Sequence, residues 1–418
     1  MNPYRPVITN PVLRRLLPGL AVSALGDGMS IVAVGWLALL LAGPGTRGTW
    51  VALAMAAYTM PSVLGTFFFA RRLAHWDGAR LAGWDATLRA TALAAIPLAY
   101  ATGALTPTLY VVLLACSSLL HSWGSAGRYT LIAEVLPTEH HLAGNALIGA
   151  IAEATAVGGP PLAGFLAAAV GPAWVIAADA ATFAVLAISY RLAVPHTVRA
   201  APPPAGASRS AGFRVILRQR RLVGLLALSF GFFFLFGPVY VALPIYVADD
   251  LHGSAALLGW FFTAFAAGAV GGALLAGYLR RLPLWPVTIG VVTTFGLTMV
   301  PIGLGAPMPV SLAALAVGGA IWAPYMPTSM ALLQRSTTRS NRAQVLAANG
   351  AVLVVAVPIG TILGGPLVEW LGARHALLLC GLAITAFGVV AAALVARAKG
   401  RFKEIDIDSL APEPQLEG

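Results

Sequence analysis

Three ionisable residues, Asp27, Glu153 and Arg128, lie deep inside long apolar runs of the sequence. An ionisable side chain at the centre of a bilayer costs roughly 2.5–3.5 kcal/mol on insertion scales. A carboxyl there can take up and release a proton, and an arginine that moves toward or away from it changes its proton affinity. The three residues together predict a proton-binding site. The alternative is a permanent ion pair of either acid with Arg128 that only fixes helix packing.

The position of each residue in its run places it at depth. At a rise of 1.5 Å per residue, Asp27 is about 15 Å beyond Leu17 and Glu153 about 16 Å beyond Leu142. Both are therefore near the middle of a hydrocarbon layer about 30 Å thick. Arg128 is about 12 Å from the inner end of its run by the same rise. Each shares a helical stripe with other polar residues, so we expect all three to face the interior of a bundle.

Other buried polar residues allow two interpretations. His121 shares a stripe with Arg128 and is either a substrate-binding residue or a buried histidine bonded to a neighbour. Asp85 and Arg89 are four residues apart, so they can pair along their own helix and are interpreted as structural. Asp179 is either structural or part of an outer gate or proton exit.

The composition indicates that a membrane surrounds these residues. The chain has 418 residues, of which 59% are hydrophobic and 10% charged, whereas soluble domains contain about 25% charged residues. The apolar runs are continuous and do not alternate with polar residues, which excludes a β-barrel. We therefore predict an all-α polytopic membrane protein.

Short segments rich in charged residues, glycine and proline separate the apolar runs. They divide the chain into twelve predicted transmembrane helices in two six-helix halves. The predicted spans lie near 17–42, 49–70, 81–103, 108–136, 142–169 and 173–194, and near 222–248, 255–279, 284–304, 309–333, 343–369 and 374–396. The predicted units are residues 1–194 for the first half, 195–221 for a cytoplasmic linker, 222–397 for the second half, and 398–418 for a disordered cytoplasmic tail.

The basic residues predict orientation more than they predict a partner. The formal net charge is +11, yet with the amino terminus inside only Arg47 and Arg374 fall in outer loops. The positive-inside rule then puts both termini in the cytoplasm and the chain in the cell membrane. The charges form no single basic face, so no nucleic acid partner is expected. Cys116 and Cys380 are far apart in apolar runs, so we expect no disulfide framework, metal site or cofactor.

An internal repeat relates the two halves. The segment that begins at Leu142 is echoed by the segment that begins at Leu346, and the Gly-Gly-Pro at 158–160 matches the Gly-Gly-Pro at 364–366. Duplicated six-helix halves with a substrate site between them at the membrane midplane are a recurrent plan among transporters.

The second half is aromatic where the first is charged. Tyr240, Trp322 and Tyr325 combine a ring with a polar group, which suits an amphipathic ligand. We expect them to line a cavity, and the alternative for each is core or lipid packing.

With these motifs the sequence resembles the major facilitator superfamily, in particular its twelve-helix drug:proton antiporter exporters of the macrolide-efflux and enterobactin-exporter type. The resemblance rests on Gly26-Asp27-Gly28, the turn from Leu131 to Leu147, the Gly-Gly-Pro at 158–160 and the arginines between the second and third spans. It implies that Arg71 or Arg72 forms a cytoplasmic latch with Glu134. The family's acidic residue before these arginines is absent, since Phe69 or Ala70 stands there.

We therefore expect a monomeric secondary transporter, and not an enzyme, that exports a hydrophobic or amphipathic small molecule in exchange for protons. One alternative is a proton-linked importer of an anionic solute, with Arg128 and His121 binding the substrate. A lipid-handling membrane protein is a further alternative, although the chain has no HExxH, CxxC or Gly-x-Ser-x-Gly motif. The absence of a phosphate-binding loop in the sequence indicates an ion gradient as the energy source.

Overall fold

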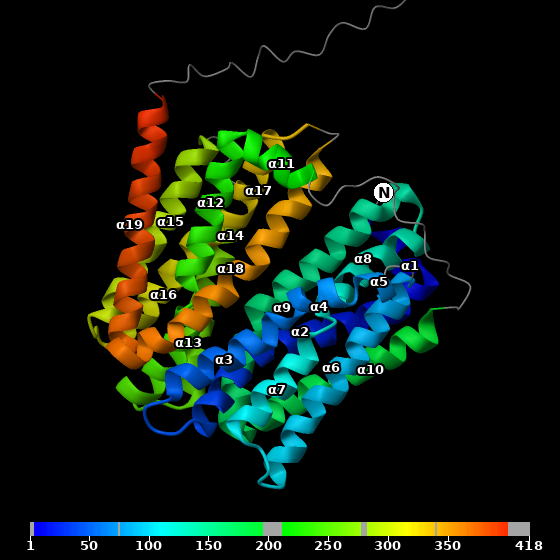
Figure 1. The fold of residues 1–418 in the computed structure, drawn as a ribbon, viewed down its shortest axis with the longest axis horizontal. Helices are drawn as coiled ribbons and strands as arrows, with labels where there is room; N and C mark the ends of the chain where they lie inside the picture. The colour runs from blue at the N-terminus through cyan, green and yellow to red at the C-terminus, as the bar shows by residue number, and fades with distance from the viewer. Residues whose placement is uncertain (1–3, 74–75, 195–210, 277–281, 339–340, 400–418) are drawn as a thin grey trace, which may run out of the picture.

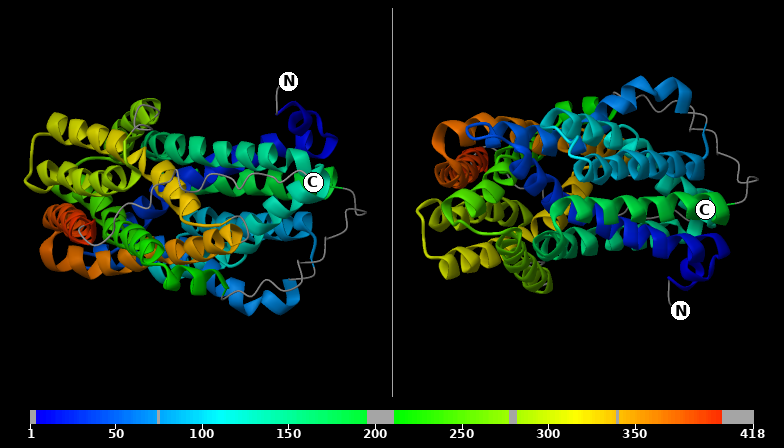
Figure 2. Two further views of the ribbon diagram at one scale, coloured as in Figure 1. Left: turned by 90° about the horizontal axis from the view of Figure 1, so that it is seen from above. Right: turned by 90° about the horizontal axis from the view of Figure 1, so that it is seen from below.

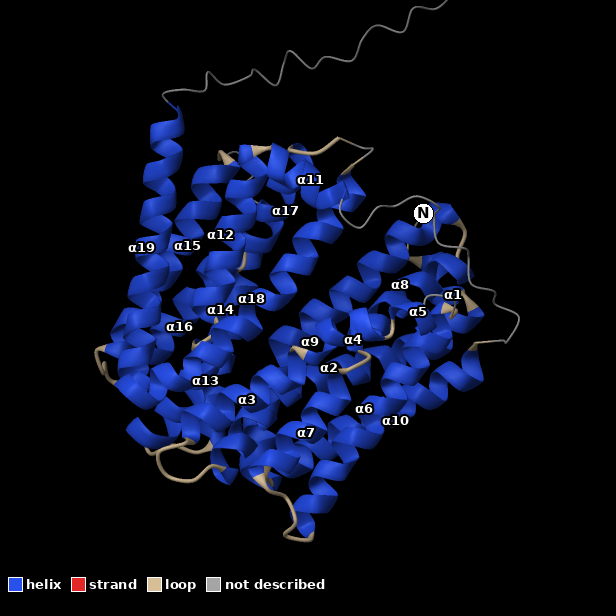
Figure 3. Ribbon diagram, viewed as in Figure 1, coloured by secondary structure: helices blue, strands red, loops and turns tan. Residues whose placement is uncertain are grey.

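The structure is a computed structural model that describes residues 4–73, 76–194, 211–276, 282–338 and 341–399. Within these ranges every regular element is a helix (Figure 3). The prediction of an all-α protein is confirmed. The predicted linker falls outside the described residues up to position 210, and so does the predicted tail from position 400 onward.

The first half is built from ten numbered helices and one short 3-10 turn. They are α1 (Arg5–Thr9), α2 (Pro11–Leu41), α3 (Arg47–Thr59), α4 (Pro61–Phe68), α5 (Ala70–Leu73), α6 (Gly78–Ala101), α7 (Pro107–Ser118), α8 (His121–Val135), η1 (Thr138–His140), α9 (His141–Val170) and α10 (Pro172–Ala193).

The second half follows the same plan. Its elements are α11 (Ala211–Arg218), α12 (Arg220–Phe236), α13 (Val239–Ile245), η2 (Tyr246–Asp250), α14 (Ala255–Ala276), α15 (Leu284–Gly303), α16 (Met308–Trp322), α17 (Tyr325–Arg335), α18 (Arg342–Leu371) and α19 (Ala373–Lys399).

Helix boundaries follow local chemistry. The Asn10 side chain accepts hydrogen bonds from the backbone N–H groups of Val12 and Leu13 at 3.0 and 3.1 Å, which caps α2. Asp77 caps α6 in the same way through the Arg80 N–H at 2.7 Å. Two helices are interrupted at prolines: α12 gives way to α13 at Pro238, and α16 gives way to α17 at Pro324.

Ten helical stretches in the described residues are long and apolar enough to cross a membrane. The other two predicted spans are occupied by α3 with α4 and by α6. The helix is interrupted at Met60, before Pro61, so that α3 and α4 have only 13 and 8 residues. α6 contains Arg80, Asp85 and Arg89, which lower its mean hydropathy. The twelve predicted positions are all helical, and ten of them have the length and composition of a membrane span.

The two halves meet at one end of the molecule. In Figure 1 the halves join at the lower edge, and their helices diverge toward the upper edge, where α11 and the N-terminus lie. In both views of Figure 2 most of the yellow-to-red helices lie on the left and most of the blue and cyan helices on the right. We call these two ends the converging end and the diverging end.

Two helix pairs make the largest contacts between the halves, and they are related by the internal repeat. α9 packs on α14, and α18 packs on α3. Gly164 of α9 lies against Gly259 of α14, and Gly48 of α3 lies against Gly365 of α18. A Cβ at Gly48 or Gly164 would overlap backbone atoms of the other half. The absence of side chains is therefore what allows the helices to touch at the converging end.

Candidate functional site

Asp27 of α2 is bound by two residues from other helices of the first half. Arg89 Nη1 of α6 donates to Asp27 Oδ1 at 2.7 Å, and the Tyr58 hydroxyl of α3 donates to the same oxygen. The Arg89 side chain is 2% exposed and the Asp27 side chain 30% exposed. The Arg89 guanidinium also lies over the rings of Phe183 and Tyr58, at 4.7 and 5.3 Å from their centroids. The site therefore holds a buried cation next to a carboxylate that is partly accessible.

This pairing differs from the predicted one. Arg89 is bonded to Asp27 and not to Asp85 on its own helix, so its interpretation as a local structural pair is wrong. Arg128 forms no ion pair within the described residues, and in this structure it is not the partner of Asp27. Local spacing favoured the wrong partner. The signal for Arg89 was its depth in a predicted span, the same criterion that singled out Arg128.

The glycines on either side of Asp27 make room for two neighbouring helices. A Cβ at Gly26 would collide with the side chains of Asp179 and Thr182 on α10. A Cβ at Gly28 would meet the backbone carbonyl of Thr155 on α9 at 2.5 Å. The Gly-Asp-Gly sequence therefore lets α10 and α9 pack directly beside the carboxylate.

Two more carboxyls are buried near the Asp27–Arg89 pair. Asp179 is fully buried, and its Oδ2 accepts a hydrogen bond from the Ser30 hydroxyl of α2. Asp85 is buried too, and its Oδ2 is 4.0 Å from His121 Nδ1. Its Oδ1 has no hydrogen-bond partner. The first half thus gathers three carboxyls around Arg89, and His121 lies against one of them.

Glu153 lies on the face of α9 that joins the halves. Gly164, which contacts α14, is eleven residues further along, or about three full turns, so the two positions share a face. Glu153 is exposed there. On α18, the position eleven residues before the contact residue Gly365 is Val354, which is 52% exposed. The face between the halves therefore has an accessible carboxyl on its first-half side and an apolar residue on the other.

The predicted aromatic residues belong to one cluster in the second half. The Trp322 ring lies 4.9 Å from Phe232 and 5.1 Å from Phe236, and Tyr240 packs edge-on against Phe236 at 5.2 Å. Tyr325 is fully buried at 4.8 Å from Phe232. Trp322 and Tyr240 are partly exposed.

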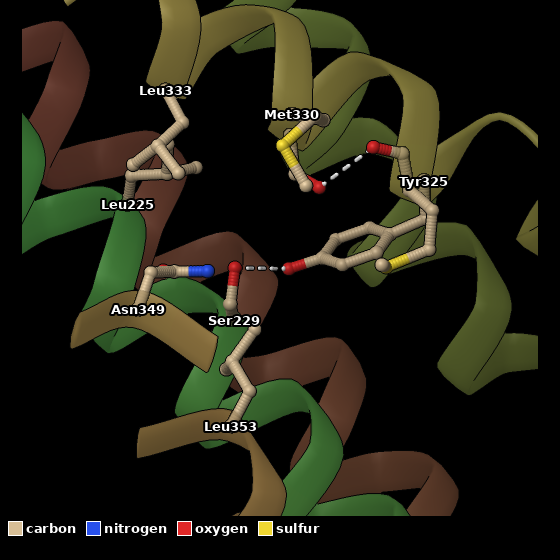
Figure 4. Close-up of a pocket in the computed structure, with 9 residues that line it drawn as sticks. Leu225, Ser229, Tyr325, Met330, Leu333, Asn349 and Leu353 are labelled. Atoms are coloured by element: carbon tan, nitrogen blue, oxygen red, sulfur yellow. Dashed lines mark hydrogen bonds between the residues drawn. The ribbon is translucent and has the colours of Figure 1, made fainter. Parts of the chain in front are cut away.

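Tyr325 also lines a small pocket between α12, α17 and α18. Its hydroxyl donates to the Ser229 hydroxyl at 2.9 Å, and the Asn349 side chain points toward the same pair (Figure 4). The remaining lining is apolar or small: Leu225, Met326, Ser329, Met330, Leu333 and Leu353. At about 20 Å³ the pocket has room for about one water molecule.

The predicted cytoplasmic latch is only partly visible. Glu134 Oε1 accepts from the Gly78 N–H at 3.2 Å, which ties α8 to the start of α6. Arg72 is exposed and makes no ion pair in the described part of the chain. The side chain of Arg71 lies outside the described residues.

A polar latch that the sequence did not reveal closes the converging end. Arg47 forms an ion pair with Asp249 of η2 across the two halves. Glu369 Oε1 of α18 accepts from the Thr49 N–H at 2.9 Å, in the first turn of α3. A carboxylate is favoured at a helix N-terminus, so both contacts stabilise the closed arrangement of this end.

We expect Arg47→Ala and Asp249→Ala each to weaken closure by only about 0.2–1 kcal/mol, because exposed ion pairs are screened by solvent. Both side chains are about two-fifths exposed, at 42% and 39%. Spin labels on Gly43 and His375 would measure the distance across this end. The double variant should open it no more than either single variant does. Fully additive effects would show that the two residues act independently.

A metal site is not evident, since no group of three His, Cys, Asp or Glu side chains in the described ranges lies close enough to hold an ion.

Comparisons with known proteins agree on one kind of molecule. The family model described as the Major Facilitator Superfamily matches residues 16–246 and 228–405. The multidrug efflux pump Tap of Mycobacterium tuberculosis is 29% identical over 415 residues, which cover 95% of this chain and 94% of that protein. Tap of Mycolicibacterium fortuitum is 27% identical over 422 residues, with 96% and 98% coverage.

Two solved structures share the fold. A bacterial homologue of the human lysosomal transporter Spinster superposes with a TM-score of 0.70 at 12% identity, over 94% of this chain and 98% of that chain. A bacterial homologue of the iron transporter ferroportin gives 0.64 at 19% identity, over 90% and 98%. At these identities the likeness concerns the fold alone.

Proposed function

Because this chain belongs to the Major Facilitator Superfamily, we propose that it is a proton-coupled exporter of hydrophobic or amphipathic small molecules, working by alternating access. The observation that carries this proposal is the Asp27–Arg89 pair, a membrane-embedded carboxylate held by a buried arginine. The similarity to proteins named multidrug efflux pumps supports export as the direction.

The coupling step is a competition for Asp27. A proton and the Arg89 guanidinium both bind the carboxylate, and protonation removes the charge that holds Arg89. Tyr58 from α3 bonds the same oxygen, and α3 packs on α18 of the other half. A change at Asp27 therefore acts on a helix that forms the contact between the halves. That is a physical route from proton binding to the packing of the converging end.

Cargo binds between the halves. Trp322 and Tyr240 supply aromatic surface on the second-half side, with Tyr325 packed behind them against Phe232, and His121 is a polar contact on the first-half side. Glu153 presents a carboxylate to the same space, and Arg128 adjusts the charge of the first half. The proposed cargo is thus apolar in its body and neutral or cationic in its polar group.

Orientation and assembly follow from the charges. The diverging end faces the cytoplasm and both termini lie there, because the loops at that end contain nearly all the arginines. In the alternate state Arg71 or Arg72 meets Glu134, which ties the segment between α4 and α6 to α8 within the first half. The protein works as a monomer in the cell membrane, since the two halves of one chain enclose the cargo site.

Transport by purified protein in proteoliposomes tests this function. An acidic lumen should drive uptake of amphipathic cationic dyes by the molecules whose cytoplasmic side faces outward. Collapse of the pH gradient with an ionophore should abolish the uptake. If preloaded anionic solutes instead leave the lumen together with protons, and the cationic dyes are not taken up, the protein is an importer.

We expect Glu153→Gln to weaken binding of cationic cargo by roughly 1 kcal/mol, about fivefold in Kd, because an exposed charge interacts through water. Binding of a neutral cargo of similar shape should not change. Tryptophan fluorescence titration with a matched cationic and neutral pair measures both. Equal losses for the two ligands would show that Glu153 acts on the protein's shape and not on cargo charge.

A further inference from the structure

Asp179 is a buried carboxyl of the first half whose burial the Asp27–Arg89 pair leaves unexplained, as it does for Asp85. It has no exposed surface, and within the described residues it makes no ion pair. Its polar neighbours are the hydroxyls of Ser30 and Thr182, the latter at 3.4 Å from Oδ1. A carboxylate removed from water without a counter-charge costs several kcal/mol, whereas the neutral acid bonded to hydroxyls does not.

The helices packed against α10 are α6, α2 and α9. Arg89 on α6 and Asp27 on α2 are the charged groups that act on Asp179, and Tyr58 of α3 lies beyond Asp27. His141 and Glu153, the ionisable residues of α9, do not act on it. Arg89 is the cation that acts on both Asp27 and Asp179, and it donates a hydrogen bond to Asp27.

Asp85 is placed differently. It faces His121 and Arg128 as well as Arg89. It therefore has cationic or potentially cationic neighbours that Asp179 lacks.

We propose that Asp179 is a second proton-binding carboxyl, and that it holds a proton while Arg89 is paired with Asp27. One arginine serves two carboxyls, so one proton must be bound for the site to stay neutral. When the Asp179 proton passes to Asp27, Arg89 leaves Asp27 and pairs with the Asp179 carboxylate, so the site keeps one proton and one ion pair. Asp27 is the partly exposed member and exchanges protons with water, whereas Asp179 is fully enclosed. This inference rests on the proposed proton coupling.

Gly26 is the structural reason that the two carboxyls can share an arginine. It lies directly against the Asp179 carboxyl, and any larger side chain would push α10 away from α2. Ser30, one helical turn along the same face, bonds the other oxygen. Gly26 thus leaves room for the Asp179 carboxyl, and Ser30 donates a hydrogen bond to it.

Infrared spectroscopy of the lipid-reconstituted protein tests this directly, because a protonated carboxylic acid has a carbonyl stretch that a carboxylate lacks. In cargo-free protein at neutral pH we expect such a band. It should disappear in Asp179→Asn, remain in Asp85→Asn, and shift in frequency in Ser30→Ala. If Asp179→Asn does not fold, the shifts in Ser30→Ala and Asp179→Glu still identify the group. A wild-type protein without the band, or a band that Asp179→Asn leaves unchanged, would overturn the proposal.

A transport assay separates this inference from the proposed function. Asp179→Asn should lose uptake driven by a pH gradient while keeping exchange of labelled for unlabelled cargo, which needs no net proton movement. Wild-type uptake that ignores the gradient would refute proton coupling as a whole. Gradient-driven uptake by Asp179→Asn at the wild-type rate would refute only the role of Asp179.

Discussion

Replacing Asp27 by asparagine is expected to abolish gradient-driven transport and to lower the free energy of unfolding by up to about 3–5 kcal/mol, because Arg89 loses the carboxylate that it is bonded to and regains a buried partner only when Asp179 gives up its proton. Arg89→Met should cost less, since the Asp27 side chain is 30% exposed and can become neutral by binding a proton. Thermal unfolding followed by tryptophan fluorescence measures both variants. The order of the two losses follows from the unequal burial of the partners.

The double variant Asp27→Asn with Arg89→Met is the matched control. It removes both charges, so it should recover most of the lost stability and still fail to transport against a gradient. Recovery of stability without recovery of transport separates coupling from folding. Stability losses that simply add would show that the two side chains do not interact, and the site described here would be wrong.

A second large effect is expected where the two halves touch. Gly48→Val and Gly164→Val place side chains into backbone of the other half. Overpacking costs about 1–3 kcal/mol per site. Since about 1.4 kcal/mol is a factor of ten in a conformational equilibrium, the double variant should depopulate the arrangement closed at the converging end and stop turnover.

Spin-label distances across the converging end measure this shift, with Gly158→Val as the control. Gly158 is on the same helix as Gly164, and nothing lies within 4 Å of a Cβ built there. Its variant should keep the wild-type distance distribution. An unchanged distribution in the Gly48→Val and Gly164→Val double variant would mean that these contacts do not decide which end is closed.

The sequence predicted the depth of the functional residues better than their partners. A carboxyl inside an apolar run is recognisable without a structure, and Asp27 does lie in a polar site between helices. Which arginine reaches it depends on how α6 is rotated against α2 and α10. Helical spacing within α6 says nothing about that rotation, so Asp85 was wrongly assigned to Arg89.

The contacts that close the converging end were not predictable from spacing. Arg47 and Asp249 are 202 residues apart and Thr49 and Glu369 are 320 apart. Each of these residues lies near the end of a helix. Charged residues are common at such positions in any membrane protein, so the sequence did not mark these as contacts between the halves. The repeat did indicate that α9 and α18 are counterparts, and both pack on the other half. The repeat thus predicted which helices correspond, and the structure shows that both lie at the interface.

The most direct test of the account is whether cargo binding displaces a proton. Purified protein in weakly buffered detergent solution is mixed with a cationic amphipathic cargo, and a pH-indicator dye reports released protons. We predict release from the wild-type protein and none from Asp27→Asn, although that variant still binds cargo. Saturating cargo binding to the wild-type protein without any proton release, across the pH range in which it transports, would contradict the account.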